Sequence, residues 1–462
     1  MTSFKNIYWI ALVFLLSLLP GALSAQTTAE TPRVPQIKKI TTVEQLMPFA
    51  RYYVRTPYRG MVSLMKPSLG AKAGDKLLLI CEITTDPMVI AAIRNAALEV
   101  GAEFNVIELN GSPKITDPVE TEVTYVDKRP DQLWPDWIWK AMETANIVAV
   151  GYGIEVHTTT EGIRKWFSER KISMVRFPYF TPEMLALSGI DYPDELFEAI
   201  NKKVWKQVYG AKEIHITDPL GTDITIHLDP GYWARVKTAY KDFVTDEEGV
   251  VWPGHIMLVP FFSREKASGK LVSDTLHGGH IPETSVEIRD GHYIEVAGSG
   301  TFAEYLRKVK QQYANTTLPG APGPGADFLM EVSLGTQPKA SRSPSEGLGG
   351  MARFGSFAEG RKRAGVIHVS FGTPTSQFIE NQETSNQLLD FLKQNNLIMQ
   401  HMDAEIYHAT YTVDGKKIVD NGHLLILDEP EIRTIAAKYG NPDELLSVDW
   451  IPPLHGADEP RR

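Results

Sequence analysis

The sequence has little of several features that would assign a chain to a particular class. Cys81 is the only cysteine among 462 residues, which excludes a framework of intrachain disulfides. Cys81 lies in an apolar run, where we expect it to be buried in the core. Acidic residues outnumber basic ones, the formal net charge is -10, and the chain has no basic stripe. We therefore expect no nucleic-acid partner.

Long apolar runs are also scarce, and the one at the N-terminus has the features of a secretory signal peptide. Lys5 precedes an apolar run from Ile7 to Leu19, and small residues follow up to Ser24 and Ala25. The run is short for a membrane span, so a cleaved signal is favoured over an uncleaved anchor. We predict a signal peptide over residues 1–25 and an exported protein, periplasmic or extracellular, with no stable membrane span after cleavage.

The first half alternates between strand and helix patterns. KLLLICE, at residues 76–82, is a continuous apolar run of strand length, as expected of a parallel strand buried on both faces. Pro87 suits a first helical turn, and Gly101 suits the position just past a helix end. The patterns predict helices over 88–100, 132–145 and 194–209, and strands over 103–109, 146–153, 213–217 and 219–228. This alternation is typical of a doubly wound parallel sheet.

From about residue 230 the pattern changes to alternating strands. Two strand pairs meet at Asp290-Gly291 and Asp414-Gly415, which are strong hairpin signals. A helix is expected over 302–312. We therefore predict an α/β protein in which an N-terminal doubly wound α/β domain, residues 38–230, is followed by a β-rich α+β metal-binding domain, residues 231–455.

Histidines and acids in four short segments of the second half are candidates for chemistry. His401 and Asp403 are two apart in a strand pattern, so their side chains project to one face. Such a pair can hold a divalent ion or form an ordinary hydrogen bond. His255, Glu331 and His368 lie in further strand-like segments, where each could also be structural. Two further histidines, His280 and His408, are equally explained as loop or hairpin surface.

Several of these segments resemble the aminopeptidase T family of metallo-aminopeptidases and the related 2,5-dihydroxypyridine 5,6-dioxygenases. In the first half the resemblance lies in KLLLICEITTDPMVIAAIRNAALEVGAEFNVIEL and DPLGTDITIHL. In the second half EVSLGTQPKA is similar to the family's Glu-x-x-x-Gly-x-Asn-Pro-x-Ala, and GVIHVSFG to its Gly-Thr-x-His-x-Ala-Leu-Gly. HMDAEIYHATYTVDG is similar to the family's His-x-Asp followed by a strand and Asp-Gly.

The resemblance implies metal ligands at Glu331, His368, His401 and Asp403. It also shows two departures. His255 stands where the family has a Glu, and Thr375 stands where the family has a Tyr ligand. Imidazole still binds zinc and cobalt well, but threonine cannot replace the tyrosine, which puts a second metal ion in doubt.

The first hypothesis is therefore an exported metal-dependent aminopeptidase that acts on the N-termini of short peptides. The resemblance implies divalent zinc, cobalt or manganese as cofactor, with a metal-activated water as nucleophile. Glu331 or Glu405 would carry protons between water and leaving amine, and Glu405 lies on the same strand face as Asp403. The resemblance also implies a homodimer.

Two other hypotheses remain open. His368, His401 and Asp403 have the composition of a two-His-one-carboxylate triad, which suits non-haem Fe(II) and a ring-cleaving dioxygenase with a small-molecule substrate. Tyr407, Phe371 and Phe354 would be available to stack on a ring, although each is more simply a core residue. The third hypothesis is a secreted, non-catalytic protein that binds a metal or ligand.

Overall fold

The structure of the protein is a computed structural model. It describes residues 40–57, 66–109, 135–151, 166–186, 189–239, 253–258, 266–276, 279–321, 323–340, 362–373, 382–395, 397 and 400–448. The predicted signal peptide lies outside these ranges. Among the helices within them, none is both long enough and apolar enough to cross a bilayer.

In the part of the chain that the structure describes, the first sheet has four parallel strands in the order β2-β1-β3-β4. Its strands are β1 (Lys76–Glu82), β2 (Glu103–Leu109), β3 (Ile147–Gly151) and β4 (Ser173–Phe177). In β1 every residue after Lys76 is buried, because helices cover both faces of a parallel sheet. The predicted strand–helix–strand unit is confirmed.

The helices of this part begin where the sequence signals them. Asp86 caps α4 by accepting a hydrogen bond from the Met88 amide at 2.7 Å, and Pro87 occupies the first turn. The described helices up to residue 208 are α2 (Val43–Arg55), α4 (Pro87–Glu99), α7 (Asp136–Met142), α9 (Pro182–Ala186) and α10 (Asp194–Val208).

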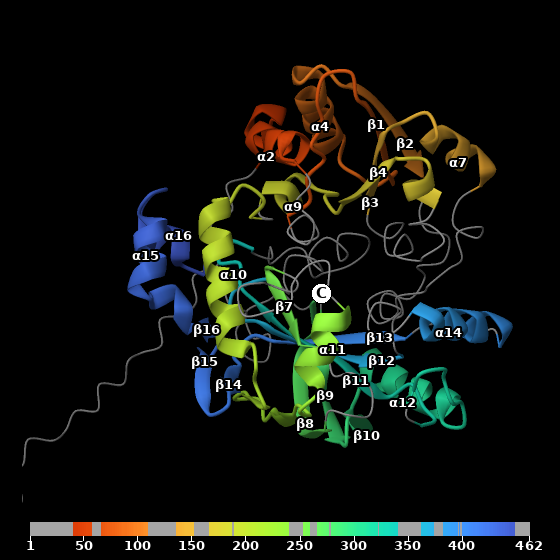
Figure 1. The fold of residues 1–462 in the computed structure, drawn as a ribbon, viewed down its shortest axis with the longest axis vertical. Coiled ribbons are helices and arrows are strands. Elements are labelled where there is room, and N and C mark those ends of the chain that lie inside the picture. The colour runs from red at the N-terminus through yellow and green to blue at the C-terminus, as the bar shows by residue number, and fades with distance from the viewer. Residues whose placement is uncertain are drawn as a thin grey trace, which may run out of the picture. The chain divides into compact units, whose positions relative to one another are not determined.

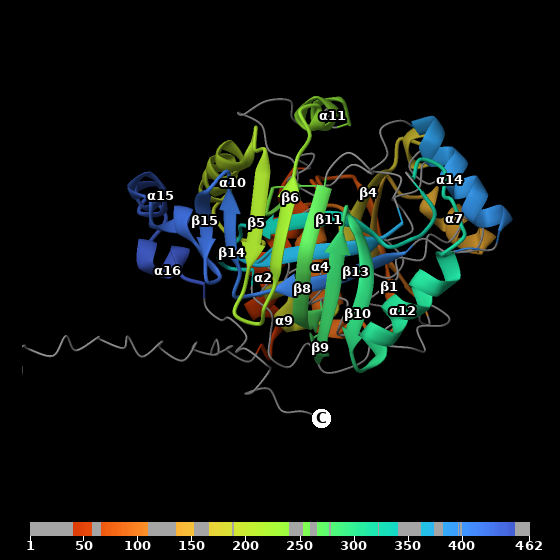
Figure 2. The ribbon, with the colours of Figure 1, turned by 90° about the horizontal axis from the view of Figure 1, so that it is seen from below.

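Within the described ranges, the second sheet has twelve strands and is mainly antiparallel. Eleven follow the order β13-β12-β11-β10-β9-β8-β6-β5-β14-β15-β16, and β7 pairs with β11. Figures 1 and 2 show these strands. Their bounds are β5 (Glu213–Thr217), β6 (Asp223–His227), β7 (His255–Leu258), β8 (Lys266–Leu276), β9 (Gly279–Arg289), β10 (His292–Gly298), β11 (Phe328–Gly335), β12 (Ile367–Gly372), β13 (His401–Ile406), β14 (Thr410–Val413), β15 (Lys416–Asp420) and β16 (His423–Leu424).

The second sheet begins earlier in the chain than the change of sequence pattern. β5 pairs with β14 and β6 pairs with β8, so both strands belong to this sheet, although they precede residue 230. The structure nevertheless has an α/β part followed by a β-rich part, so the predicted fold class is confirmed. The domain bounds 38–230 and 231–455 stay a prediction.

Both predicted hairpins form, and their turn residues have the required backbone. Asp290 and Gly291 have φ of 49° and 82°, and Asp414 and Gly415 have φ of 47° and 79°. Positive φ at both central residues defines the tight turn whose twist matches the two strands. The remaining helical segments are α11 (Tyr232–Ala239), α12 (Thr301–Tyr313), α14 (Gln382–Gln394), α15 (Pro430–Ala436), α16 (Pro442–Leu446) and the 3-10 turn η2 (Leu425–Asp428).

Candidate metal centre

Three neighbouring antiparallel strands, β11, β12 and β13, carry the candidate site. Alternation along each strand places polar residues on one face and apolar residues on the other. The apolar face contributes Val332, Leu334, Ile367, Val369, Met402 and Ala404 to the large hydrophobic core. The polar face carries two rows of residues that pair directly across the strands, Glu331–Ser370–Asp403 and Ser333–His368–Glu405.

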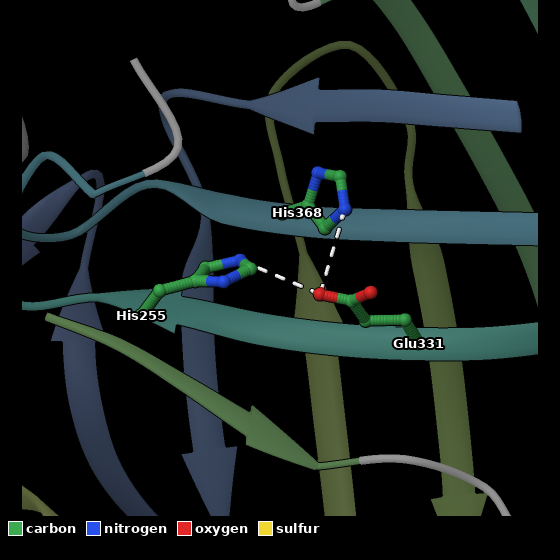
Figure 3. A group of neighbouring side chains, drawn as sticks. All are labelled: His255, Glu331 and His368. Atoms are coloured by element: carbon green, nitrogen blue, oxygen red, sulfur yellow. Dashed lines mark ion pairs between the residues drawn. The ribbon is translucent and has the colours of Figure 1, made fainter. Parts of the chain in front are cut away.

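A fourth strand, β7, adds an imidazole to this face. β7 pairs antiparallel with β11, and His255 lies opposite Gly335. Its Nε2 is 3.5 Å from Glu331 Oε1, and Nε2 of His368 is 3.6 Å from the same oxygen. Figure 3 shows the two imidazoles converging on the carboxylate. The two rings are 5.3 Å apart and inclined by 66°.

These spacings fit a single metal ion. Donor atoms that hold zinc at about 2.1 Å in a tetrahedron are about 3.4 Å from one another. The distances from Glu331 Oε1 to the two histidine nitrogens, 3.5 and 3.6 Å, are close to that value, and all three donor atoms lie within 4.8 Å of one another. A His₂Glu set is also the ligand set of many catalytic zinc sites. The residues present therefore fit a divalent ion.

Burial makes charge compensation necessary at this site. His255 and His368 are fully buried, and Glu331, Asp403 and Glu405 are each at most 2% exposed. A carboxylate removed from water is costly unless positive charge or hydrogen bonds replace its hydration. A bound divalent cation would supply that positive charge in the middle of the polar face.

Two serine hydroxyls hold the carboxylates in place. Ser333 Oγ donates to Glu331 Oε1 at 2.6 Å. Ser370 Oγ donates to Asp403 Oδ1 and lies 2.8 Å from Nε2 of His368. Asp403 Oδ1 is itself 3.2 Å from that nitrogen. His368 therefore has Glu331 as one carboxylate neighbour and Asp403 as another.

Glu405 has a hydroxyl partner of its own. The buried Tyr407 Oη donates to Glu405 Oε2 at 2.6 Å. The backbone oxygen of Glu405 accepts a hydrogen bond from Ser273 Oγ at 3.1 Å. Because Glu405 lies directly opposite His368 in the register, this carboxylate is a cross-strand neighbour of the metal group.

The structure brings together three of the predicted ligands, His255, Glu331 and His368. Asp403 contacts His368 and lies outside that group of three, and Glu405 stands in the neighbouring row. His401 is the first residue of β13, while its side chain is outside what the structure describes. The metal and catalytic roles of all six residues stay predictions.

Of the other residues considered from the sequence, the structure describes only some. Thr375, Phe354 and the side chain of His280 lie outside the described parts. Phe371 is buried in the hydrophobic core on the other face of β12. Sequence reasoning missed Ser333 and Ser370, and the available signal was their spacing of two from Glu331 and from His368.

The fold carries a buried group of residues that fits a divalent metal ion. Two solved structures are similar to this chain. One is 2,5-dihydroxypyridine dioxygenase from Pseudomonas putida KT2440, with 16% identity, a TM-score of 0.54, and coverage of 85% of this chain and 100% of the other. The other is wild-type AmpT from Thermus thermophilus, with 15% identity, a TM-score of 0.46, and coverage of 83% and 99%.

The predicted resemblance to the 2,5-dihydroxypyridine dioxygenases is thus found at the level of the fold. The dioxygenase shares the fold of this chain over most of its length. Neither the protein-family models nor the curated proteins contain a match to the sequence.

Proposed function

We propose that the protein is a metal-dependent hydrolase of the aminopeptidase type, which removes residues from the N-termini of short peptides. The observation that supports it is the buried group of His255, Glu331 and His368, in which the carboxylate oxygen lies 3.5 and 3.6 Å from the two imidazole nitrogens, close to the donor spacing of a tetrahedral metal site. The choice of a peptide substrate rests on the resemblance of the sequence motifs to the aminopeptidase T family.

A divalent zinc, cobalt or manganese ion in this group would polarise a carbonyl and lower the pKa of a water. The surrounding residues would then transfer protons and orient the metal ligands. Glu405 is the proposed proton carrier, because it is buried beside His368 and its second oxygen is fixed by Tyr407. Ser333 would orient Glu331 toward the ion, as hydrogen bonds to ligating carboxylates commonly do.

A ring-cleaving dioxygenase is the second candidate, and two observations favour it. The fold matches a dioxygenase over that protein's whole length. In addition, two histidines and one carboxylate are the ligand set of non-haem Fe(II) oxygenases, and His255, Glu331 and His368 have that composition. The donor set by itself therefore fits either reaction class.

The metal content of the purified protein distinguishes the two candidate functions. The protein would be purified without chelator, once in air and once anaerobically, and its metals measured per chain. Zinc, cobalt or manganese, with hydrolysis of aminoacyl amides, supports the peptidase. Iron, with oxygen consumption on a dihydroxypyridine, would transfer the proposal to the dioxygenase. Metal binding without turnover of either substrate would leave a non-catalytic binding protein.

Glu331→Gln is the matched variant for this experiment. It keeps the shape of the side chain and removes the charge shared by both imidazoles. Loss of metal together with loss of turnover would link the activity to this group. If the Glu331→Gln variant kept its turnover, this group of residues would be excluded as the active site.

Export and assembly are further parts of the proposal. We propose that residues 1–25 are a cleaved signal and that the mature chain acts in the periplasm or outside the cell as a homodimer. Mass spectrometry of the mature N-terminus and light scattering of the purified protein test the two statements separately.

A further inference from the structure

A buried asparagine lies on the apolar face of α10. Asn201 is fully buried, and Phe197, Ile200 and Val204 on the same helix belong to the hydrophobic core. An amide removed from water is costly unless hydrogen bonds replace its hydration, and asparagine is a weak helix former. The position therefore indicates a role that an apolar side chain could not fill.

The amide of Asn201 connects two chain segments that are far apart in the sequence. Its Oδ1 accepts one hydrogen bond from the backbone N–H of Gly254 at 2.5 Å and another from Thr336 Oγ1 at 2.6 Å. Its Nδ2 donates to the carbonyl oxygen of Phe197, one turn earlier in α10, at 2.6 Å, which fixes the orientation of the amide. The N–H of Thr336 donates to the carbonyl oxygen of Gly254 at 3.2 Å, so the two segments are also bonded to each other.

These two segments adjoin the strands that carry two of the candidate ligands. Gly254 immediately precedes His255, the first residue of β7, and Thr336 immediately follows Gly335, the last residue of β11. His255 and Gly335 lie opposite each other in the register. Within the described sheet, β7 is four residues long and has β11 as its one strand partner. Asn201 therefore joins the two strands at the end of their ladder where His255 lies.

We propose that Asn201 is a positioning residue of the candidate metal centre, which clamps the strand of His255 to the strand of Glu331 and so sets the separation of these two side chains. This inference rests on the metal site of the proposed function. It adds to that site a residue that acts through the backbone and is not a ligand.

The first reason is the small tolerance of a metal site. Its ligands have to be held within about 0.5 Å of the required geometry by the structure around them. Nε2 of His255 is 3.5 Å from Glu331 Oε1, and this separation crosses from β7 to β11. The end of a short strand is where a sheet opens most readily. The hydrogen bonds of Asn201 restrain the backbone at the residue next to His255.

The second reason is that the other two ligands have support of their own. Glu331 and His368 lie on β11 and β12, which pair along most of their length. Both strands are buried at every position. Loss of the clamp should therefore displace His255 and leave the other two donors in place. The expected result is a weaker site with altered geometry.

The test is metal binding by the metal-free protein, titrated with Zn(II) against a chromophoric chelator and with Co(II) followed by visible absorption. Asn201→Ala removes the acceptor of both hydrogen bonds. We expect its affinity for Zn(II) to fall by roughly tenfold to a hundredfold, and its Co(II) spectrum to change because one imidazole is displaced. Asn201→Asp keeps an oxygen acceptor for Gly254 and Thr336, and should recover most of the affinity.

Two threonine substitutions separate positioning from general stability. Thr336→Val keeps the shape of the side chain and removes one donor to Asn201. Thr222→Val is the matched control, because the buried Thr222 hydroxyl also joins two segments of the same sheet, by donating to the carbonyl oxygen of Val272 on β8 at 2.9 Å. Both variants should lose stability in thermal unfolding. Only Thr336→Val should lower the affinity for Zn(II).

Unchanged Zn(II) affinity and an unchanged Co(II) spectrum in Asn201→Ala would overturn the positioning role and leave the proposed metal-dependent function standing. An equal loss of affinity in Thr222→Val and Thr336→Val would also overturn it, since the loss would then follow general destabilisation. If Asn201→Ala does not fold, Asn201→Asp and Thr336→Val decide the question by the same titrations. A wild-type protein that binds no metal would refute both proposals together.

Discussion

The buried carboxyl of Glu82 allows a prediction that the structure makes quantitative. Glu82 is the last residue of β1 and is 1% exposed. Burial raises the pKa of this carboxyl from 4.5 to about 7, since removal from water penalises the charged form. The perturbation is Glu82→Gln, which keeps the size of the side chain and cannot ionise.

The sign of the effect follows from proton binding. Between pH 4.5 and about 7 the folded chain keeps a proton on Glu82 that the unfolded chain has lost. The free energy of unfolding of wild type therefore falls as the pH rises through this window and levels off above it. The rise of this pKa from 4.5 to about 7 corresponds to roughly 3 kcal/mol. Glu82→Gln should therefore be more stable than wild type by up to that amount above neutral pH, with little difference in acid.

Denaturant and thermal unfolding of both proteins at about pH 5 and about pH 8.5 measure this difference. Glu108→Gln is the matched control, because Glu108 lies on the neighbouring strand β2 and is exposed. Its unfolding should follow wild type at both pH values. Equal stabilities of Glu82→Gln and wild type at the higher pH would show that the carboxylate is not desolvated and would refute the reasoning.

Three further substitutions test the site and its support. Glu331→Gln should lower the affinity for Zn(II) by more than about tenfold, measured by competition with a chromophoric chelator, and unchanged affinity would exclude Glu331 as a ligand. Tyr407→Phe removes the hydrogen bond to buried Glu405 and should cost about 1.5–3 kcal/mol in chemical denaturation, so a loss near zero would mean that this hydrogen bond adds nothing to stability. Gly365→Ala places a Cβ 1.9 Å from the carbonyl oxygen of Gly422 at a φ of 90°, and should abolish soluble expression, whereas a normally folded variant would contradict that contact.

Local pattern determined much of the first part of the fold. The continuous apolar run at 76–82, the cap at Asp86 and the glycine at 101 predict β1 and α4 within a residue or two. The Asp-Gly pairs likewise predict both hairpins, because only positive φ closes such turns. These features depend on residues that are close together in the chain. A sequence pattern therefore contains the information that determines them.

Strand partnership was decided by the tertiary structure. β5 follows an α/β pattern in sequence and yet pairs with β14, some two hundred residues later. Alternation shows which face of a strand is apolar, but it does not show which distant strand completes the hydrogen bonds.

The candidate site shows the same division. The sequence by itself determined that His368, Glu331 and Asp403 stand on polar strand faces, and motif resemblance named them as ligands. Only the tertiary structure joined His255 to Glu331 and His368, brought Asp403 Oδ1 to 3.2 Å from His368 Nε2, and placed the Ser370 hydroxyl against both of these groups. The reason is physical: a metal site is a set of distances of a few ångströms between strands far apart in the chain, and the register that fixes those distances is formed only when the sheet assembles.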